Sequence, residues 1–290
     1  MLLTTVTLWG LNFTAAKYLI THGFAPLAFA SPRYLTAALI FVVLTLAFEG
    51  SLRMGRRDAA LLAATSVVLL VNQLGFIYAL DFTTASTVAL IFGTLPVFTV
   101  LIATVSGIER VSAQILVAGA VSIMGVGLVI AGADGTLSSN LKGDVLALTA
   151  VASWAMYTVI IAPLMTRHSP FRISAWVLTM TAILLTIAGS RQLMNEDYPT
   201  GWQVWALFAF AVGGPLVVTN VLWFKAIDRV GPSRASLFAN LQFFLAAVFG
   251  VILLSETIAP LQLVGGATIG VAILLSRFQR GDVPAPQPVE

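Results

Sequence analysis

Cysteine is absent from this 290-residue chain, and charged residues make up only 9% of it. The lack of cysteine excludes disulfides and thiolate chemistry. A soluble domain has about 25% charged residues, so the scarcity of charge excludes an ordinary water-exposed surface. The sequence also lacks a phosphate-binding Gly-rich loop, paired metal-ligand histidines and a nucleophile–histidine–acid set. We therefore expect no enzymatic activity, no cofactor and no metal site.

Apolar sequence fills the chain instead, with 59% hydrophobic residues and a mean hydropathy of +0.97. A helix that spans the hydrocarbon core needs about 20 mostly apolar residues. Ten such runs follow one another with short connections, at residues 2–21, 28–48, 58–80, 84–105, 112–132, 142–163, 172–190, 202–227, 232–254 and 259–277. We predict an all-α membrane protein of ten transmembrane helices, with membrane lipid around it.

Part of the sequence occurs twice, 147 residues apart. The matched pairs are Ala79 and Ala226, Asp81 and Asp228, Ser86 and Ser233, Leu90 and Leu237, and Glu109 and Glu256. Repeats on this scale indicate homologous structural units. Since each unit would have five spans, an odd number, the second unit enters the membrane from the opposite side. We therefore predict two inverted five-helix repeats, at residues 1–132 and 133–278, followed by a disordered tail at 279–290.

The distribution of Lys and Arg predicts the orientation, because short cytoplasmic loops carry the excess of positive charge. With the N-terminus inside, ten of these residues fall in inner segments and only Lys142 and Arg191 in outer loops. Both termini are therefore expected in the cytoplasm. The high sequence pI of about 9.5 comes from these scattered loop charges, so nucleic acid is not an expected partner.

Several short motifs resemble a known family. They are Trp9-Gly10-Leu11-Asn12-Phe13 with Lys17, Arg33-Tyr34, Leu95-Pro96-Val97, Ser153-Trp154-Ala155 and Ser255-Glu256. In this order they resemble the EamA-type transporters of the drug/metabolite transporter superfamily, and the overall pattern is similar to the YddG-like aromatic amino acid exporters. The resemblance implies ten helices in the cytoplasmic (inner) membrane of a bacterium and export of small metabolites, amino acids including aromatic ones. One departure is Phe243, which stands where the family pattern has a proline opposite Pro96.

Polar and aromatic side chains inside the spans are candidates for the substrate site, because such groups are costly in lipid. The substrate-binding candidates are Trp9, Asn12, Gln73, Tyr78, Trp154, Tyr157, Asn220, Trp223 and Asn240. Amides suit the charged ends of an amino acid, and rings suit its side chain. The alternative, hydrogen bonding between helices, stays open for each of them.

Other residues are candidates for access and gating. Lys17, Arg33 and Asp81 fall near the outer ends of their helices, where they would either guide a substrate carboxylate at the external mouth or pair with one another. Gly93, Pro96, Gly214 and Pro215 interrupt two helices and serve either as gating hinges or as passive kinks. Glu109 and Glu256 are expected to accept hydrogen bonds at the N-terminus of the helix that follows each.

Every acidic residue lies at a helix end or in a loop, as do both histidines. A proton-coupled carrier uses an intramembrane acid or histidine, so we expect a facilitative uniporter that works by alternating access through a central cavity. The alternatives are a carrier for a phosphorylated or nucleotide-linked metabolite, and a channel-like or receptor membrane protein. Gly266 and Gly270 would form either a weak homodimer face or a close contact within a monomer.

Overall fold

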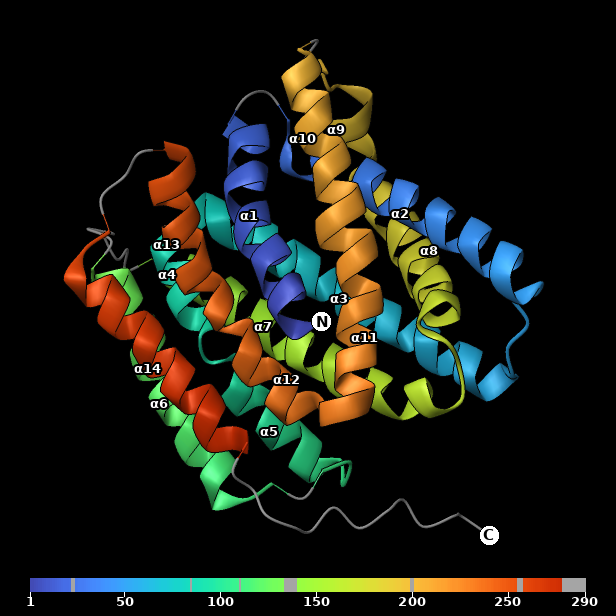
Figure 1. Ribbon diagram of the computed structural model, residues 1–290. Coiled ribbons are helices and arrows are strands. Elements are labelled where there is room, and N and C mark those ends of the chain that lie inside the picture. The colour runs from blue at the N-terminus through green and yellow to red at the C-terminus, as the bar shows by residue number, and fades with distance from the viewer. Residues whose placement is uncertain are drawn as a thin grey trace, which may run out of the picture.

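The computed structural model describes residues 1–21, 24–83, 85–109, 111–132, 140–198, 201–254 and 258–277, and all regular structure in these ranges is helical (Figure 1). Seven helical segments in them are long and apolar enough to cross a membrane: Pro26–Glu49, Arg56–Ala79, Thr87–Val105, Ala113–Ala131, Leu141–Thr166, Pro170–Ala188 and Trp202–Val230. The chain is an all-helical, multi-pass membrane protein. The count of ten spans stays a prediction.

The helices follow the order of the expected spans. The first half contains α1 (Leu2–Thr21), α2 (Pro26–Glu49), α3 (Arg56–Phe82), α4 (Ala85–Phe92), α5 (Leu95–Val105) and α6 (Ala113–Ala131). The second half contains α7 (Leu141–Ile161) with a 3-10 turn (Ala162–Thr166), α8 (Pro170–Ala188), α9 (Ser190–Met194), α10 (Trp202–Val212), a π-helical turn (Gly213–Val218), α11 (Thr219–Val230), α12 (Pro232–Ala239), α13 (Leu241–Leu254) and α14 (Pro260–Arg277). The tail at 279–290 lies outside the described residues.

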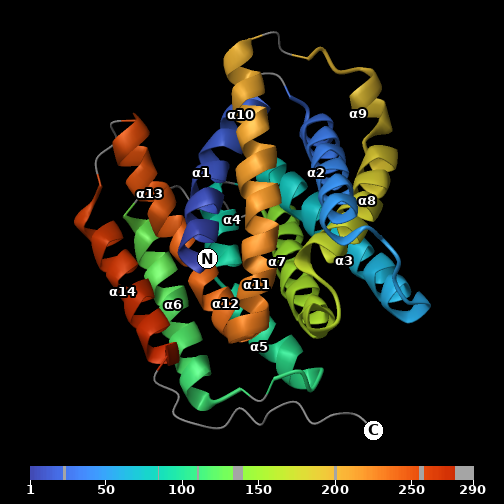
Figure 2. The same cartoon turned by 45° about the vertical axis from the view of Figure 1, so that its right-hand side comes forward.

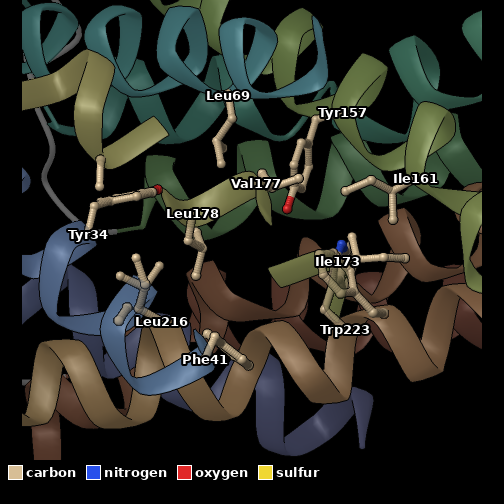
Figure 3. Packing of buried hydrophobic residues seen from close by; sticks show 14 of the residues in the cluster. Tyr34, Phe41, Leu69, Tyr157, Ile161, Ile173, Val177, Leu178, Leu216 and Trp223 are labelled. Atoms are coloured by element: carbon tan, nitrogen blue, oxygen red, sulfur yellow. The ribbon is translucent and has the colours of Figure 1, made fainter. Parts of the chain in front are cut away.

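Helices of the two halves pack against each other in pairs. α6 lies beside α14 on one flank and α2 beside α8 on the other, in both views (Figures 1 and 2). Between these flanks, side chains from α2, α3, α7, α8 and α11 form the largest buried cluster, which includes Tyr34, Leu69, Tyr157, Leu178 and Trp223 (Figure 3). Because lipid is as apolar as these side chains, close packing rather than the hydrophobic effect holds such helices together.

The α6–α14 pair depends on two glycines. A Cβ atom at Gly265 would lie 2.6 Å from both the carbonyl oxygen of Gly125 and the amide nitrogen of Val129, and a Cβ at Gly125 would lie 2.9 Å from the carbonyl oxygen of Gly265. Gly266 packs under the ring of Phe244 in the same chain, whereas a Cβ at Gly270 would meet no described atom within 4 Å. Gly265 and Gly266 therefore serve packing within the monomer.

Two helices are interrupted at equivalent positions. α4 ends at Phe92 and α12 ends at Ala239. Both the first and the last residue of α12 lie 147 residues after those of α4. Gly93 and Thr94 separate α4 from α5, and Asn240 separates α12 from α13. The amide of Asn240 donates to the carbonyl oxygen of Gly93, which lies 147 residues earlier, at 2.9 Å. The second interruption has no glycine or proline, so no local pattern in the sequence marks it.

Acidic side chains of one half close helix N-termini of the other. Glu49, the last residue of α2, accepts a hydrogen bond from Ser169, the N-cap of α8, and pairs with Arg172 at 2.8 Å. Glu196, 147 residues later, accepts from the backbone N–H of Ala25, the N-cap of α2, at 2.8 Å. Glu196 thus satisfies a backbone N–H at the start of α2, as helix N-termini require, whereas Glu49 binds the side chains of Ser169 and Arg172 at the start of α8. The two contacts are reciprocal between the halves.

Glu109 caps a different helix from the one expected. It accepts from both the backbone N–H and the hydroxyl of Ser233, at the start of α12, and not from the N-terminus of α6, which follows it. Gly231, at a φ of 81°, makes room for this carboxylate, because a Cβ there would overlap with it. Burial raises the pKa of Glu109, and the hydrogen bonds from Ser233 and the charge of Arg234 oppose that rise. Glu256 lies outside the described residues.

Two substitutions in α14 test the packing of the two flanking helices. We expect Gly265→Ala to lower the thermal unfolding midpoint of the purified protein in detergent, since overpacking against backbone costs about 1–3 kcal/mol. Gly270→Ala is the matched control and should keep or raise the midpoint, because a helical Gly→Ala change gains up to about 1 kcal/mol. Equal midpoints for the two variants would contradict the proposed contact between α6 and α14.

Candidate functional site

A cavity of about 140 Å³ lies between the two halves. α1, α2 and α3 of the first half and α7, α8 and α11 of the second contribute to its wall, together with residues near the two helix interruptions. Its polar and aromatic lining consists of Trp9, Asn12, Arg33, Tyr34, Asn72, Gln73, Phe76, Phe92, Trp154, Tyr157, Thr219, Asn220, Trp223 and Gln242. The lining thus combines rings, amides and one guanidinium group.

Most of the candidates from the sequence line this cavity. Those that do are Trp9, Asn12, Gln73, Trp154, Tyr157, Asn220 and Trp223. Tyr78 packs instead against the large apolar cluster, and Asn240 lies in the second helix interruption. Tyr34 and Thr219 also line the cavity but were not among the candidates from the sequence. Tyr34 directly follows Arg33, and Thr219 directly precedes Asn220. Whether the lining residues bind a substrate stays a prediction.

Four aromatic rings form a continuous cluster on the cavity wall. The ring centroid of Trp9 lies 5.7 Å from that of Trp154, edge to face, and 5.0 Å from that of Trp223. The ring of Tyr157 stacks on that of Trp154, with centroids 5.2 Å apart and planes inclined by 27°. These separations are in the range in which aromatic pairs attract one another. The cluster therefore presents a rigid apolar surface contributed by both halves.

The π-helical turn between α10 and α11 positions Trp9. The indole N–H of Trp9 donates to the hydroxyl of Thr219 at 3.1 Å and to the carbonyl oxygen of Pro215 at 3.3 Å. Single π turns are frequent at functional sites, because they change the partners of the carbonyl groups in the helix. Gly214 and Pro215 are both part of this turn. Their role as a gating hinge, like that of Gly93 and Pro96, stays a prediction.

The amide side chains divide between two tasks. Asn72 donates to the carbonyl oxygen of Ala150 in α7 at 2.8 Å and accepts from the amide of Gln73 at 2.7 Å. Asn240 donates to the hydroxyl of Ser122 as well as to Gly93, both at 2.9 Å. These two residues therefore link helices. Asn220 donates only locally, to the carbonyl oxygen of Leu216, among the bonds described.

Some polar atoms in the cavity wall have no partner among the described residues. They are Oδ1 of Asn12, Nε of Arg33 and Nε1 of Trp223. A buried polar atom without a hydrogen bond costs about 1–3 kcal/mol, and such atoms call for an explanation such as a bound molecule. These two donors and one acceptor belong to residues that line the cavity.

The charges expected at the external mouth are only partly described. Arg33 lies about two helical turns inside α2 and lines the cavity itself. The side chains of Lys17 and Asp81 lie outside the part of the chain that the structure describes. Within that part, histidines and acids form no group that could hold a metal ion.

The sequence and the fold were compared with known proteins. The model of the EamA-like transporter family matches residues 1–131 and again residues 141–278. The uncharacterized transporter YyaM of Bacillus subtilis is 26% identical over 83% of this chain and 81% of its own length, and the uncharacterized transporter YoaV of the same organism is 23% identical over 96% and 95%. An uncharacterized transporter of Archaeoglobus fulgidus is 23% identical over 94% and 95%. A crystal structure of a protein without a stated function shares the fold, with a TM-score of 0.76 and 17% identity, and the match covers 95% of this chain and 94% of that one.

The hydrogen bonds of Asn240 provide a test of the link between the two helix interruptions. Asn240→Ala should lower the free energy of unfolding by about 1–3 kcal/mol, because it leaves the carbonyl oxygen of Gly93 without its partner. Ser122→Ala should cost less, since Asn240 then keeps Gly93. SDS-induced unfolding in mixed micelles measures both changes. Asn220→Ala, which removes only a local bond, is the control, and a loss as large as that of Asn240→Ala would refute a special role for Asn240.

Proposed function

We propose that this chain, which belongs to the EamA-like transporter family, exports amino acids, including aromatic ones, across the cytoplasmic (inner) membrane of a bacterium, with both its termini in the cytoplasm. It is a membrane transporter, as its relatives are named. The amino acid cargo, the direction of transport and the mechanism are the proposal.

The composition of the cavity wall is the observation that supports this cargo. A zwitterion needs donors for its carboxylate and acceptors or π faces for its ammonium group. Asn12, Asn220 and the ring cluster of Trp9, Trp154 and Trp223 offer such groups within one cavity. The same rings would stack on an aromatic or apolar side chain. Small-molecule sites are commonly built in this way, from apolar walls with a few convergent polar groups.

The arrangement of the helices supports alternating access. Carriers with inverted repeats bind substrate where the repeats meet and often use discontinuous helices there. In this chain Gly93 and Asn240 interrupt their helices at positions 147 residues apart, and both interruptions border the cavity wall formed by Phe92, Leu95, Ala239 and Gln242. Rocking of the halves about this wall would expose the cavity to one side of the membrane and then to the other.

The charges of the cavity favour facilitated transport over proton coupling. Among the lining residues that the structure describes there is no Asp, Glu or His. Proton-coupled carriers use such groups within the membrane. A phosphorylated or nucleotide-linked cargo would need a cluster of basic residues, and Arg33 alone among the described lining residues is basic. We therefore favour a uniporter of amino acids.

Flux into proteoliposomes tests this function. Purified protein should carry phenylalanine, methionine or threonine with saturable kinetics, with trans-stimulation and without dependence on an imposed pH gradient. Trp154→Ala and Tyr157→Ala should each lower the rate about tenfold or more, because each removes a ring of the cavity cluster.

Trp202→Ala provides the control for these variants, since Trp202 is an exposed tryptophan outside the cavity lining. Its flux should equal that of the unmodified protein. No flux for any of the three amino acids would refute the cargo, and flux that requires the pH gradient would refute uniport.

A further inference from the structure

Arg33 is the one charged side chain among the described residues that line the cavity. It lies on α2, whereas the tryptophan cluster comes from α1, α7 and α11. The guanidinium group therefore belongs to the same cavity as the aromatic surface but to a different part of its wall. An arrangement of this kind suits a small molecule with an anionic group at one end and an apolar group elsewhere.

No described carboxylate forms an ion pair with Arg33. Glu49, Glu109 and Glu196 each bind a helix N-terminus of the other half, and Asp58 pairs with Arg167 and His168. A cation in a membrane interior is costly unless a partner or water compensates it. Among the described residues the guanidinium charge therefore has no carboxylate partner, and an anionic group of a ligand would provide one.

Two aromatic rings lie next to the guanidinium group of Arg33. Its ζ carbon lies 4.8 Å from the ring centroid of Phe29 and 5.8 Å from that of Tyr34, both within the range of cation–π attraction. Tyr34 is itself part of the cavity wall. Tyr34 also forms a side-chain hydrogen bond with Arg33, and Nε of the guanidinium group has no described partner. The planar edge of a guanidinium group matches the two oxygens of a carboxylate, whereas a lysine ammonium does not.

We propose that Arg33 determines the specificity of this transporter by binding the carboxylate group of the substrate. The inference rests on the proposed transport of amino acids and narrows it: a substrate needs a carboxylate, whereas its ammonium group is bound by weaker, exchangeable contacts. The ring cluster then selects the side chain. Arg33 acts at the binding site and not only at the external mouth.

Three probes that differ in one group each test this assignment. They are L-phenylalanine, L-phenylalaninol, which has a hydroxymethyl group in place of the carboxylate, and 3-phenylpropionate, which lacks the ammonium group. Calorimetric titration of the full chain in nanodiscs measures their affinities. The unmodified protein should bind phenylalanine about tenfold or more tightly than phenylalaninol.

Arg33→Gln should lower the affinity for phenylalanine and 3-phenylpropionate about tenfold to a hundredfold and leave that for phenylalaninol unchanged. Arg33→Lys should give an intermediate loss, because it keeps the charge without the planar fork. If Arg33→Gln does not fold, Phe29→Leu takes its place: it should weaken phenylalanine binding severalfold and spare phenylalaninol. An equal loss for all three probes, or no loss, overturns the proposal.

The two proposals fail separately in this experiment. Binding of 3-phenylpropionate that depends on Arg33, without binding of phenylalanine, would refute the amino acid cargo and uphold Arg33 as the carboxylate ligand. If the unmodified protein and the Arg33→Gln variant bind phenylalanine with equal affinity, the cargo is upheld and the role of Arg33 is refuted.

Discussion

The first turn of a helix has N–H groups without acceptors, and in this chain acids of one half contact helix N-termini of the other half at three described sites. Glu196 accepts from the backbone N–H of Ala25 before α2, and Glu109 accepts from that of Ser233 in α12. Glu49 accepts from the hydroxyl of Ser169, the N-cap of α8. These contacts tie the two halves together at the ends of their helices. None of these three acids lines the cavity, and Arg33 is the one charged side chain among its described lining residues.

The closely packed helix pair α6–α14 and the two interrupted helices lie in different parts of the fold. Gly125 and Gly265 hold α6 against α14 at backbone contact, which leaves little freedom for that pair. The interruptions at Gly93 and Asn240 lie beside the cavity instead and are linked by one side-chain hydrogen bond. Movement around a substrate would therefore occur where few bonds need to change. The ring cluster has members from both halves, so such movement would shift its rings relative to one another and to a bound substrate.

The sequence predicted the helical membrane fold and the family, because long apolar runs and ordered motifs are strong signals. It also selected Trp9, Trp154 and Trp223, since polar and aromatic side chains inside apolar spans are candidates for a substrate site. It did not reveal the second interruption, which occurs at Asn240 without a glycine or proline. The bond between Asn240 and Gly93 at this point is a contact that only the folded chain provides. The π-helical turn that positions Trp9, the cross-half cap by Glu109 and the depth of Arg33 in the cavity are tertiary features in the same sense. No local pattern records which distant residue will supply the partner.

Accessibility of one cavity residue from both sides of the membrane tests the central claim of alternating access most directly. The chain has no cysteine, so a single Asn220→Cys variant can be labelled by a membrane-impermeant maleimide in vesicles of either orientation. We expect labelling from both sides, with protection by phenylalanine on each, whereas Trp202→Cys, an exposed position outside the cavity, should react from one side only. Labelling of the Asn220→Cys variant from one side alone, whether or not substrate is present, would contradict a cavity that opens to the two sides in turn.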